Sequence, residues 1–117
     1  LIAPADAAWS ELPTDYVPAA AGAPAALPRV GPSTVDEIAA ALRAAKQPML
    51  LLGGQALLGE ALIQAGRIAA HTGVRLHAET FNRRVERGAG RLPLVFLPYR
   101  GELALELMAG VDLMVLV

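Results

Sequence analysis

The residues best placed to bind a ligand are four that form a turn after an apolar run: Gly53, Gly54, Gln55 and Ala56. The run at 49–52 reads M-L-L-L, without polar alternation, and is typical of a strand covered on both faces of a parallel sheet. A helical apolar pattern follows the glycines, so we expect free amides at a helix start, where the helix dipole favours an anion. The spacing matches neither the dinucleotide nor the P-loop motif, which leaves an empty turn as the alternative.

A second candidate is the polar loop predicted at 79–91, which contains four arginines and two glycines. It follows a predicted strand, and open α/β sheets bind ligands at the carboxyl ends of their strands. Arg83 and Arg84 can hold a phosphate or carboxylate through paired N–H groups, with Thr80 and Asn82 beside them. We therefore add these four residues to the candidate anion or nucleotide site. The alternative is a solvated loop whose arginines form salt bridges to a neighbouring domain.

No group of side chains has the spacing of a catalytic site or a metal site. Ser10, Ser33, His71 and His77 are the only serines and histidines, and none lies in a nucleophile-elbow or H-E-x-x-H pattern. We interpret His71 as a residue at a helix C-terminus and His77 as an outward-facing strand residue. The chain has no cysteine, so thiolate chemistry and disulfides are excluded. We predict no catalytic residue and no metal ligand.

Composition narrows the partners and the compartment. The formal charge of the 117 residues is −1, which argues against nucleic acid or an anionic membrane as the main partner. No apolar stretch approaches the roughly 18 to 20 residues that cross a bilayer, and the N-terminal residues lack the basic start of a secretory signal. We expect a soluble, cytoplasmic protein. Lys46 is the only lysine, which leaves little scope for Schiff-base chemistry.

The segment before the candidate site is expected to be an extended linker. Residues 1–32 are rich in alanine and proline and show no sustained period. Trp9, Tyr16 and Val17 are expected either to pin this segment to a surface or to lie on a free tail. We assign 1–32 to the end of a preceding domain plus a linker, and 33–117 to an α/β domain.

Helical and strand periods then alternate along the domain. Thr34 followed by Glu37 is a capping-box pattern, so a helix is expected to begin there. The predicted helices are 34–45, 55–71 and 101–109, and the predicted strands are 48–52, 74–78, 94–97 and 113–117. This order predicts a three-layer α/β/α fold with a parallel Rossmann-like sheet.

The last apolar run, 113–117, is predicted to lie beside the strand at 48–52. We expect the domain to be incomplete on its C-terminal side, so that this strand presents a free edge. A free apolar edge favours pairing with another chain, so we expect self-association there.

Four segments together resemble the thiamine diphosphate-dependent enzymes. L-I-A-P-A-D-A-A-W-S (1–10) resembles the last strand of their pyrimidine-binding domain. T-V-D-E-I-A-A-A-L-R-A-A-K-Q-P-M-L-L-L-G-G-Q-A (34–56) resembles the start of their central domain, and A-G-V-D-L-M-V-L-V (109–117) one of its later strands. E-T-F-N-R-R-V-E-R-G-A-G-R (79–91) resembles the acetolactate synthase-like and benzoylformate decarboxylase-like branch.

The resemblance implies the central, non-catalytic domain of an enzyme that decarboxylates 2-oxo acids and can join the products. It places thiamine diphosphate and Mg²⁺ in the two outer domains of the same enzyme, which are the expected partners together with further copies in a homo-oligomer. In this family the central domain holds FAD, holds an adenine nucleotide or is empty. The segment 80–84 replaces the glycine-rich segment of the FAD-binding members, which argues against FAD. The alternative is a stand-alone nucleotide- or NAD-binding module of similar fold.

Overall fold

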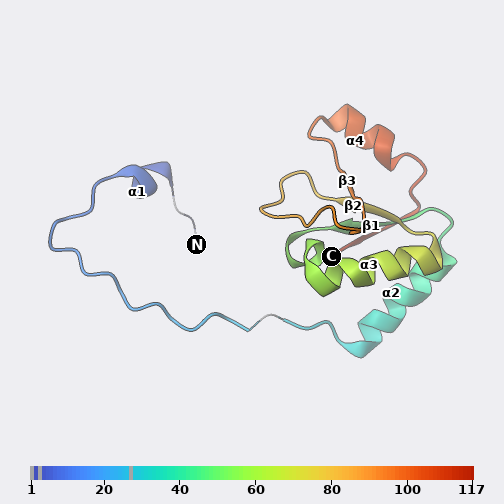
Figure 1. Ribbon diagram of the computed structural model, residues 1–117, viewed down its shortest axis with the longest axis horizontal. Helices are drawn as coiled ribbons and strands as arrows, with labels where there is room; N and C mark the ends of the chain where they lie inside the picture. Colours follow the sequence, from blue (N-terminus) through green and yellow to red (C-terminus); the bar gives the residue numbers. More distant parts are fainter. Residues whose placement is uncertain (1, 3, 27) are drawn as a thin grey trace.

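The computed structural model describes residues 2, 4–26 and 28–117, which form an extended N-terminal arm and an α/β body (Figure 1). The radius of gyration is 19.0 Å and the longest dimension is 61 Å. A compact chain of this length has a radius of roughly 13 Å, so the arm accounts for the excess. The arm contains one short helix, α1 (Ala5–Trp9), which has no buried residue.

The body is built on four parallel strands in the order β3-β2-β1-β4. Their bounds are β1 (Pro48–Leu52), β2 (Arg75–Ala78), β3 (Val95–Phe96) and β4 (Leu113–Leu116). In the register, Leu50 lies between Leu76 of β2 and Val115 of β4. The predicted α/β fold with a parallel sheet is therefore confirmed, as is the position of the last strand beside the first.

Helices cover both faces of this sheet (Figure 1). α2 (Pro32–Ala44) and α3 (Gly59–Thr72) lie on one face, and α4 (Gly101–Met108) lies on the other. The α2 and α3 face contains the main core, because alternate strand residues point into it. This core consists of Leu42, Leu50, Leu52, Leu57, Leu62, Ala65, Val74 and Ala78.

Two details of the predicted helices are wrong. The first helix begins at Pro32 with Gly31 as its N-cap and no side-chain cap, so Thr34 and Glu37 do not form the expected capping box. Proline at the first helical position needs no N–H partner and already has a helical φ, which explains the earlier start. The helix predicted at 55–71 is divided into a 3₁₀ turn, η1 (Gly54–Leu57), and α3. Gly54 and Gly59 have φ values of +49° and +48°, which an α-helix cannot contain.

The outward position predicted for His77 is also wrong, because only 8% of this residue is exposed. Its register partners, Leu51 and Val95, share its face of the sheet, and α4 crosses that face. A face with two covers has no solvated side, so the alternation along β2 does not separate buried from exposed residues.

β4 forms one edge of the sheet, and its side chains alternate in exposure. Leu113 and Val115 pack against the core, whereas Leu116 is 72% exposed. Self-association through this edge stays a prediction. Within the described part of the chain, no helix combines the length and apolarity needed to cross a membrane.

Candidate functional site

The carboxyl ends of β1 and β4 meet where the sheet reverses its winding direction. The connection from β1 to β2 runs through α3 on one face, and the connection from β3 to β4 runs through α4 on the other (Figure 1). The amide of Gly53 donates a 2.8 Å hydrogen bond to the carbonyl of Val117, which closes this junction. Open α/β sheets bind ligands at such a switch point. It is therefore the place where a ligand of this fold would lie.

Glu79 lies beside Gly53 at this junction. Its amide donates to the carbonyl of Leu52 at 3.0 Å, which continues the β1–β2 pairing by one residue. A β-carbon at Gly53 would lie 3.3 Å from Oε1 of Glu79, so the glycine leaves room for this carboxylate. The sequence analysis did not select Glu79. An acid after the second strand of a βαβ unit, some twenty residues beyond the glycine turn, is the signal that could have identified it.

The turn amides predicted to bind an anion are partly used within the turn. The amide of Ala56 donates to Gly53 at 3.0 Å, and the amide of Leu58 donates to Gln55 at 3.2 Å. Gly54 and Gln55 are exposed. The first turn of α3 lies further along the chain, at Gly59.

A carboxylate of the chain itself occupies the N-terminus of α3. Glu86 accepts a hydrogen bond from the backbone of Gly59, and this bond is the largest cause that lowers the pKa of Glu86. Arg91 Nε contacts Glu86 Oε2 at 3.0 Å and lowers the same pKa further. The anion favoured by the helix dipole is thus supplied internally.

The four predicted loop residues fall into two pairs. Thr80 Oγ1 donates to the carbonyl of Leu97 at 2.8 Å and joins the ends of β2 and β3. Asn82 Nδ2 donates to the carbonyl of Glu79 and closes a turn. Arg83 and Arg84 are exposed, and no hydrogen bond or ion pair in the described chain joins them to Gly53 or Gly54. A shared site for all eight predicted residues stays a prediction.

Two exposed aromatic rings stand near the same edge of the sheet. Phe81 follows β2 and Tyr99 follows β3, and their rings meet edge to face with centroids 5.5 Å apart. Both side chains are largely exposed. Exposed aromatic rings of this kind can stack on a planar ligand.

His77 and Arg75 form a buried basic pair on the face covered by α4. Arg75 Nη1 donates to the carbonyl of Leu107 at 3.3 Å, near the C-terminus of α4. Nε and Nη2 of Arg75 and Nδ1 of His77 are buried without a partner. Burial lowers the pKa of His77, a hydrogen bond to the backbone of Val95 opposes that change, and the charge of Arg75 adds to it.

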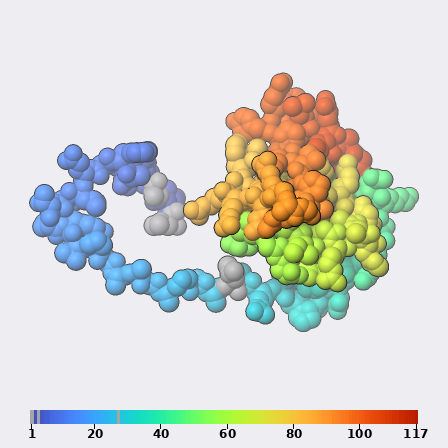
Figure 2. Space-filling view, in the orientation of Figure 1, coloured from blue at the N-terminus to red at the C-terminus, as the bar shows by residue number. Residues whose placement is uncertain are grey.

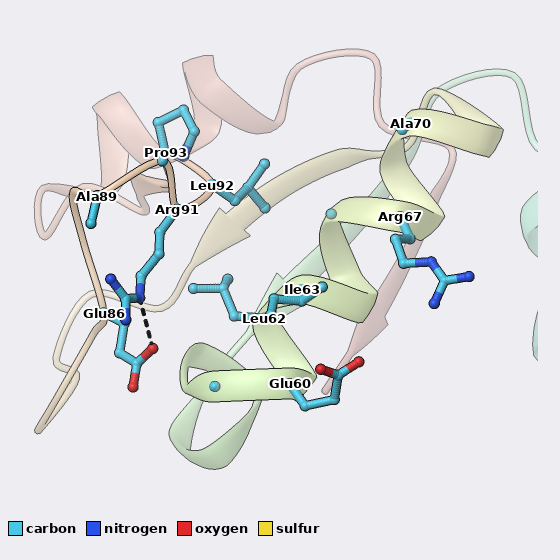
Figure 3. A pocket seen from close by; sticks show the side chains of 13 residues that line it. Glu60, Leu62, Ile63, Arg67, Ala70, Glu86, Ala89, Arg91, Leu92 and Pro93 are labelled. Carbon is cyan, nitrogen blue, oxygen red and sulfur yellow. Dashed lines mark hydrogen bonds and ion pairs between the residues drawn. The ribbon is translucent and has the colours of Figure 1, made fainter.

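A groove of about 900 Å³ separates α3 from the loop at 86–93 (Figure 3). Leu62, Ile63 and Leu92 supply apolar lining, and the Glu86–Arg91 ion pair lies at one end. Leu92 packs where Gly66 has no side chain. Among the described residues, no group of three or more His, Asp or Glu side chains is placed to hold a metal ion.

Comparison with known proteins gives one informative similarity. The chain is 41% identical over 116 residues, 99% of its length, to a protein of Mycobacterium tuberculosis (strain ATCC 25618 / H37Rv) named "Putative acetolactate synthase large subunit IlvX". It spans 22% of the length of that protein. No protein-family model matches the chain, and no solved structure matches it significantly. Over nearly its whole length, the chain is therefore similar to a segment of an acetolactate synthase-like protein.

Proposed function

We propose that this chain is the central, non-catalytic domain of an acetolactate synthase-like, thiamine diphosphate-dependent enzyme that decarboxylates 2-oxo acids. The observation that carries the proposal is the 41% identity over 99% of the chain, together with the parallel α/β body. In this role the domain supports the outer domains and the contacts between subunits. The parent enzyme is proposed to be cytoplasmic and oligomeric.

The cofactors belong outside this chain in the proposal. Thiamine diphosphate and Mg²⁺ supply the decarboxylation chemistry in the parent enzyme. The residues described here offer no three-residue cluster of acids and histidines for the metal. The contribution of this chain is therefore structural: Asp112, Arg75 and the core residues fix the relative positions of the strands.

The test compares the isolated chain with the parent protein. CO₂ release from pyruvate and benzoylformate is measured with thiamine diphosphate and Mg²⁺ present. The parent is expected to turn over a 2-oxo acid, and the 117-residue chain is expected to match a heat-killed control because it has no catalytic cluster. A parent without cofactor-dependent CO₂ release, or an active isolated chain, would reject the proposal.

A second candidate function, nucleotide binding at the switch point, is favoured by the position of Glu79. A carboxylate beside a glycine turn at the end of the second strand can accept hydrogen bonds from ribose hydroxyls. The same carboxylate repels phosphate, so we place the ribose rather than the pyrophosphate near Gly53. Phe81 and Tyr99 offer rings for stacking a base. FAD fits less well, because two amides of the turn are used internally and Glu79 lies over the glycine.

This candidate is tested by calorimetry with ADP, 2′-deoxy-ADP and FAD. ADP is expected to bind more tightly than its deoxy analogue, and Glu79→Gln is expected to reduce that preference about tenfold, the effect of losing one hydrogen bond to a charged group. Glu106→Gln, which removes an exposed acid on α4, is the matched control. Equal binding of both ADP forms, or stoichiometric FAD in purified protein, would contradict the assignment.

A further inference from the structure

A groove with cationic sides runs between α2 and α3. It has a volume of about 500 Å³ and an apolar floor that includes Ile38, Leu42 and Ile68. Its charged or titratable lining residues are Arg43, Arg67 and His71, and no acidic residue lines it. We call this region the α2–α3 groove. Its chemistry fits a segment that has apolar side chains and negative charges.

The N-terminal arm has that complementary chemistry. Asp6, Glu11 and Asp15 are its acids, and no Lys, Arg or His precedes Arg29. Large apolar side chains lie between these acids, and Trp9 is 87% exposed. Leu12, Tyr16 and Val17 are also exposed. Exposed apolar side chains grouped in one short segment mark a contact surface.

The short helix of the arm also requires a surface. α1 has five residues and buries none of them. Isolated helices of fewer than about 12 residues are marginal in water, since their stability comes mainly from packing an apolar face. Trp9, the last residue of α1, is the natural anchor for such packing.

The arm does not lie on its own body. Figures 1 and 2 show it leading away from the start of α2, with a gap between the arm and the groove-forming helices. Five prolines between residues 13 and 32 fix φ and hold the intervening chain extended. A stiff connection opposes folding back but leaves the arm free to reach another molecule.

We propose that residues 5–17 of one chain dock into the α2–α3 groove of a second copy, so that two copies exchange arms. Trp9 and Leu12 would bury against Ile38, Leu42 and Ile68. The three acids of the arm would face the cationic sides of the groove. Exchange of identical segments is a low-cost route to a symmetric dimer. This inference is independent of the proposed enzymatic role.

The fluorescence of Trp9 tests the proposal directly, because Trp9 is the only tryptophan of the chain. As protein concentration rises, its emission is expected to shift to shorter wavelength, since docking removes the ring from water. Association through the β4 edge would not move this signal. The shift should weaken with added NaCl, because partly exposed ion pairs are screened. An emission that stays the same across a hundredfold concentration range would overturn the proposal.

A charge exchange distinguishes two copies from one. The arm-reversed chain carries Asp6→Lys, Glu11→Lys and Asp15→Lys, and the groove-reversed chain carries Arg43→Glu and Arg67→Glu. Each chain alone is expected to need at least tenfold higher concentration for the same shift, and an equimolar mixture should recover the wild-type behaviour. A mixture that behaves as the sum of its parts would refute arm exchange.

Two controls complete the experiment. Arg83→Glu with Arg84→Glu makes the same charge change outside the groove and should leave the shift unaltered. The arm-reversed chain keeps every core residue, so its result stands even if the groove-reversed chain fails to fold. A shift that is present at all concentrations would mean that the arm docks on its own body, which contradicts exchange between copies.

Discussion

The carboxylate of Asp112 accepts the backbone amide of Lys46 at 2.7 Å. It also accepts the amide of Gln47 at 2.9 Å, and the amide of Asp112 donates to the carbonyl of Gln47 at 3.3 Å. One side chain thus joins the turn after α2 to the start of β4. The register of β1 and β4 depends on this junction, because Pro48 and Leu113 form the first pair of that ladder.

Removal of the Asp112 charge is expected to abolish one acid-dependent part of the stability. The hydrogen bond from the Lys46 amide is the largest cause that lowers the pKa of Asp112 below its ordinary value of 3.8. A depressed carboxyl pKa stabilises the fold above the unfolded value and loses this effect as the pH falls through the folded value. Asp112→Asn should therefore melt lower than wild type at pH 7, with a smaller difference at pH 3. Asp36→Asn, an exposed acid in α2, is the control, and equal effects of the two variants would contradict the role of Asp112.

His77 is expected to make the fold less stable in mildly acidic solution. Its pKa is lowered, chiefly by burial, so it stays neutral in the fold while the unfolded chain takes up a proton below pH 6.5. The unfolded state binds more protons there, and stability falls as the pH falls from 6.5 through the folded pKa. Urea unfolding of His77→Asn should show a weaker dependence on pH between 7.5 and 5 than wild type. His71→Asn, at an exposed position, should keep the wild-type slope; the idea fails if His77→Asn keeps it too.

Two glycines of α3 are expected to respond to alanine in opposite directions. Gly66 lies inside the helix, and a β-carbon there would meet Leu92 Cδ2 at 3.5 Å, an ordinary contact. Gly66→Ala should therefore raise the free energy of unfolding by about 0.5–1 kcal/mol. Gly73 ends α3 with a φ of +73°, so Gly73→Ala should lower it by about 1 kcal/mol. Denaturant titration of both variants checks the pair, and a loss of stability in Gly66→Ala would show that Leu92 cannot accommodate the methyl group.

Glu86 is expected to exclude external anions from α3. Its carboxylate receives the backbone hydrogen bond of Gly59, so its removal frees that donor. Sulfate should then raise the melting temperature of Glu86→Ala more than that of wild type. NaCl at equal ionic strength separates binding from screening, and Glu102→Ala on α4 serves as the matched variant. If sulfate acts equally on all three proteins, the internal-anion interpretation is wrong.

The sequence predicts the strands of this domain better than it predicts the junctions between elements. The bounds of β1 agree with the prediction because an apolar run between Pro48 and Gly53 has few alternatives. The break at Gly54 and Gly59 was missed, since helical periodicity continues across it and only the backbone angles reveal it. The burial of His77 depends on α4, a helix that packs over it from a distant part of the sequence.

The candidate site was only partly predictable for the same reason. Gly53 is recognisable from its neighbours, and its position at the switch point follows from strand order. Glu79 and Glu86 have roles that depend on spatial partners, Gly53 and Gly59, which lie more than twenty residues away. Pattern analysis assigns charge to a loop, but the fold decides which backbone amides that charge meets.

The pairing of β1 with β4 also determines the order in which the body can assemble. Met49 pairs with Met114, so one edge of β1 has no partner until nearly the whole body has been synthesised. Parallel pairing between distant segments requires the closure of a long loop, which slows folding. A ribosome-bound chain would therefore complete β2, α3 and most of the core before β4 arrives, and exposed β1 backbone during that interval is the point at which a chaperone would act.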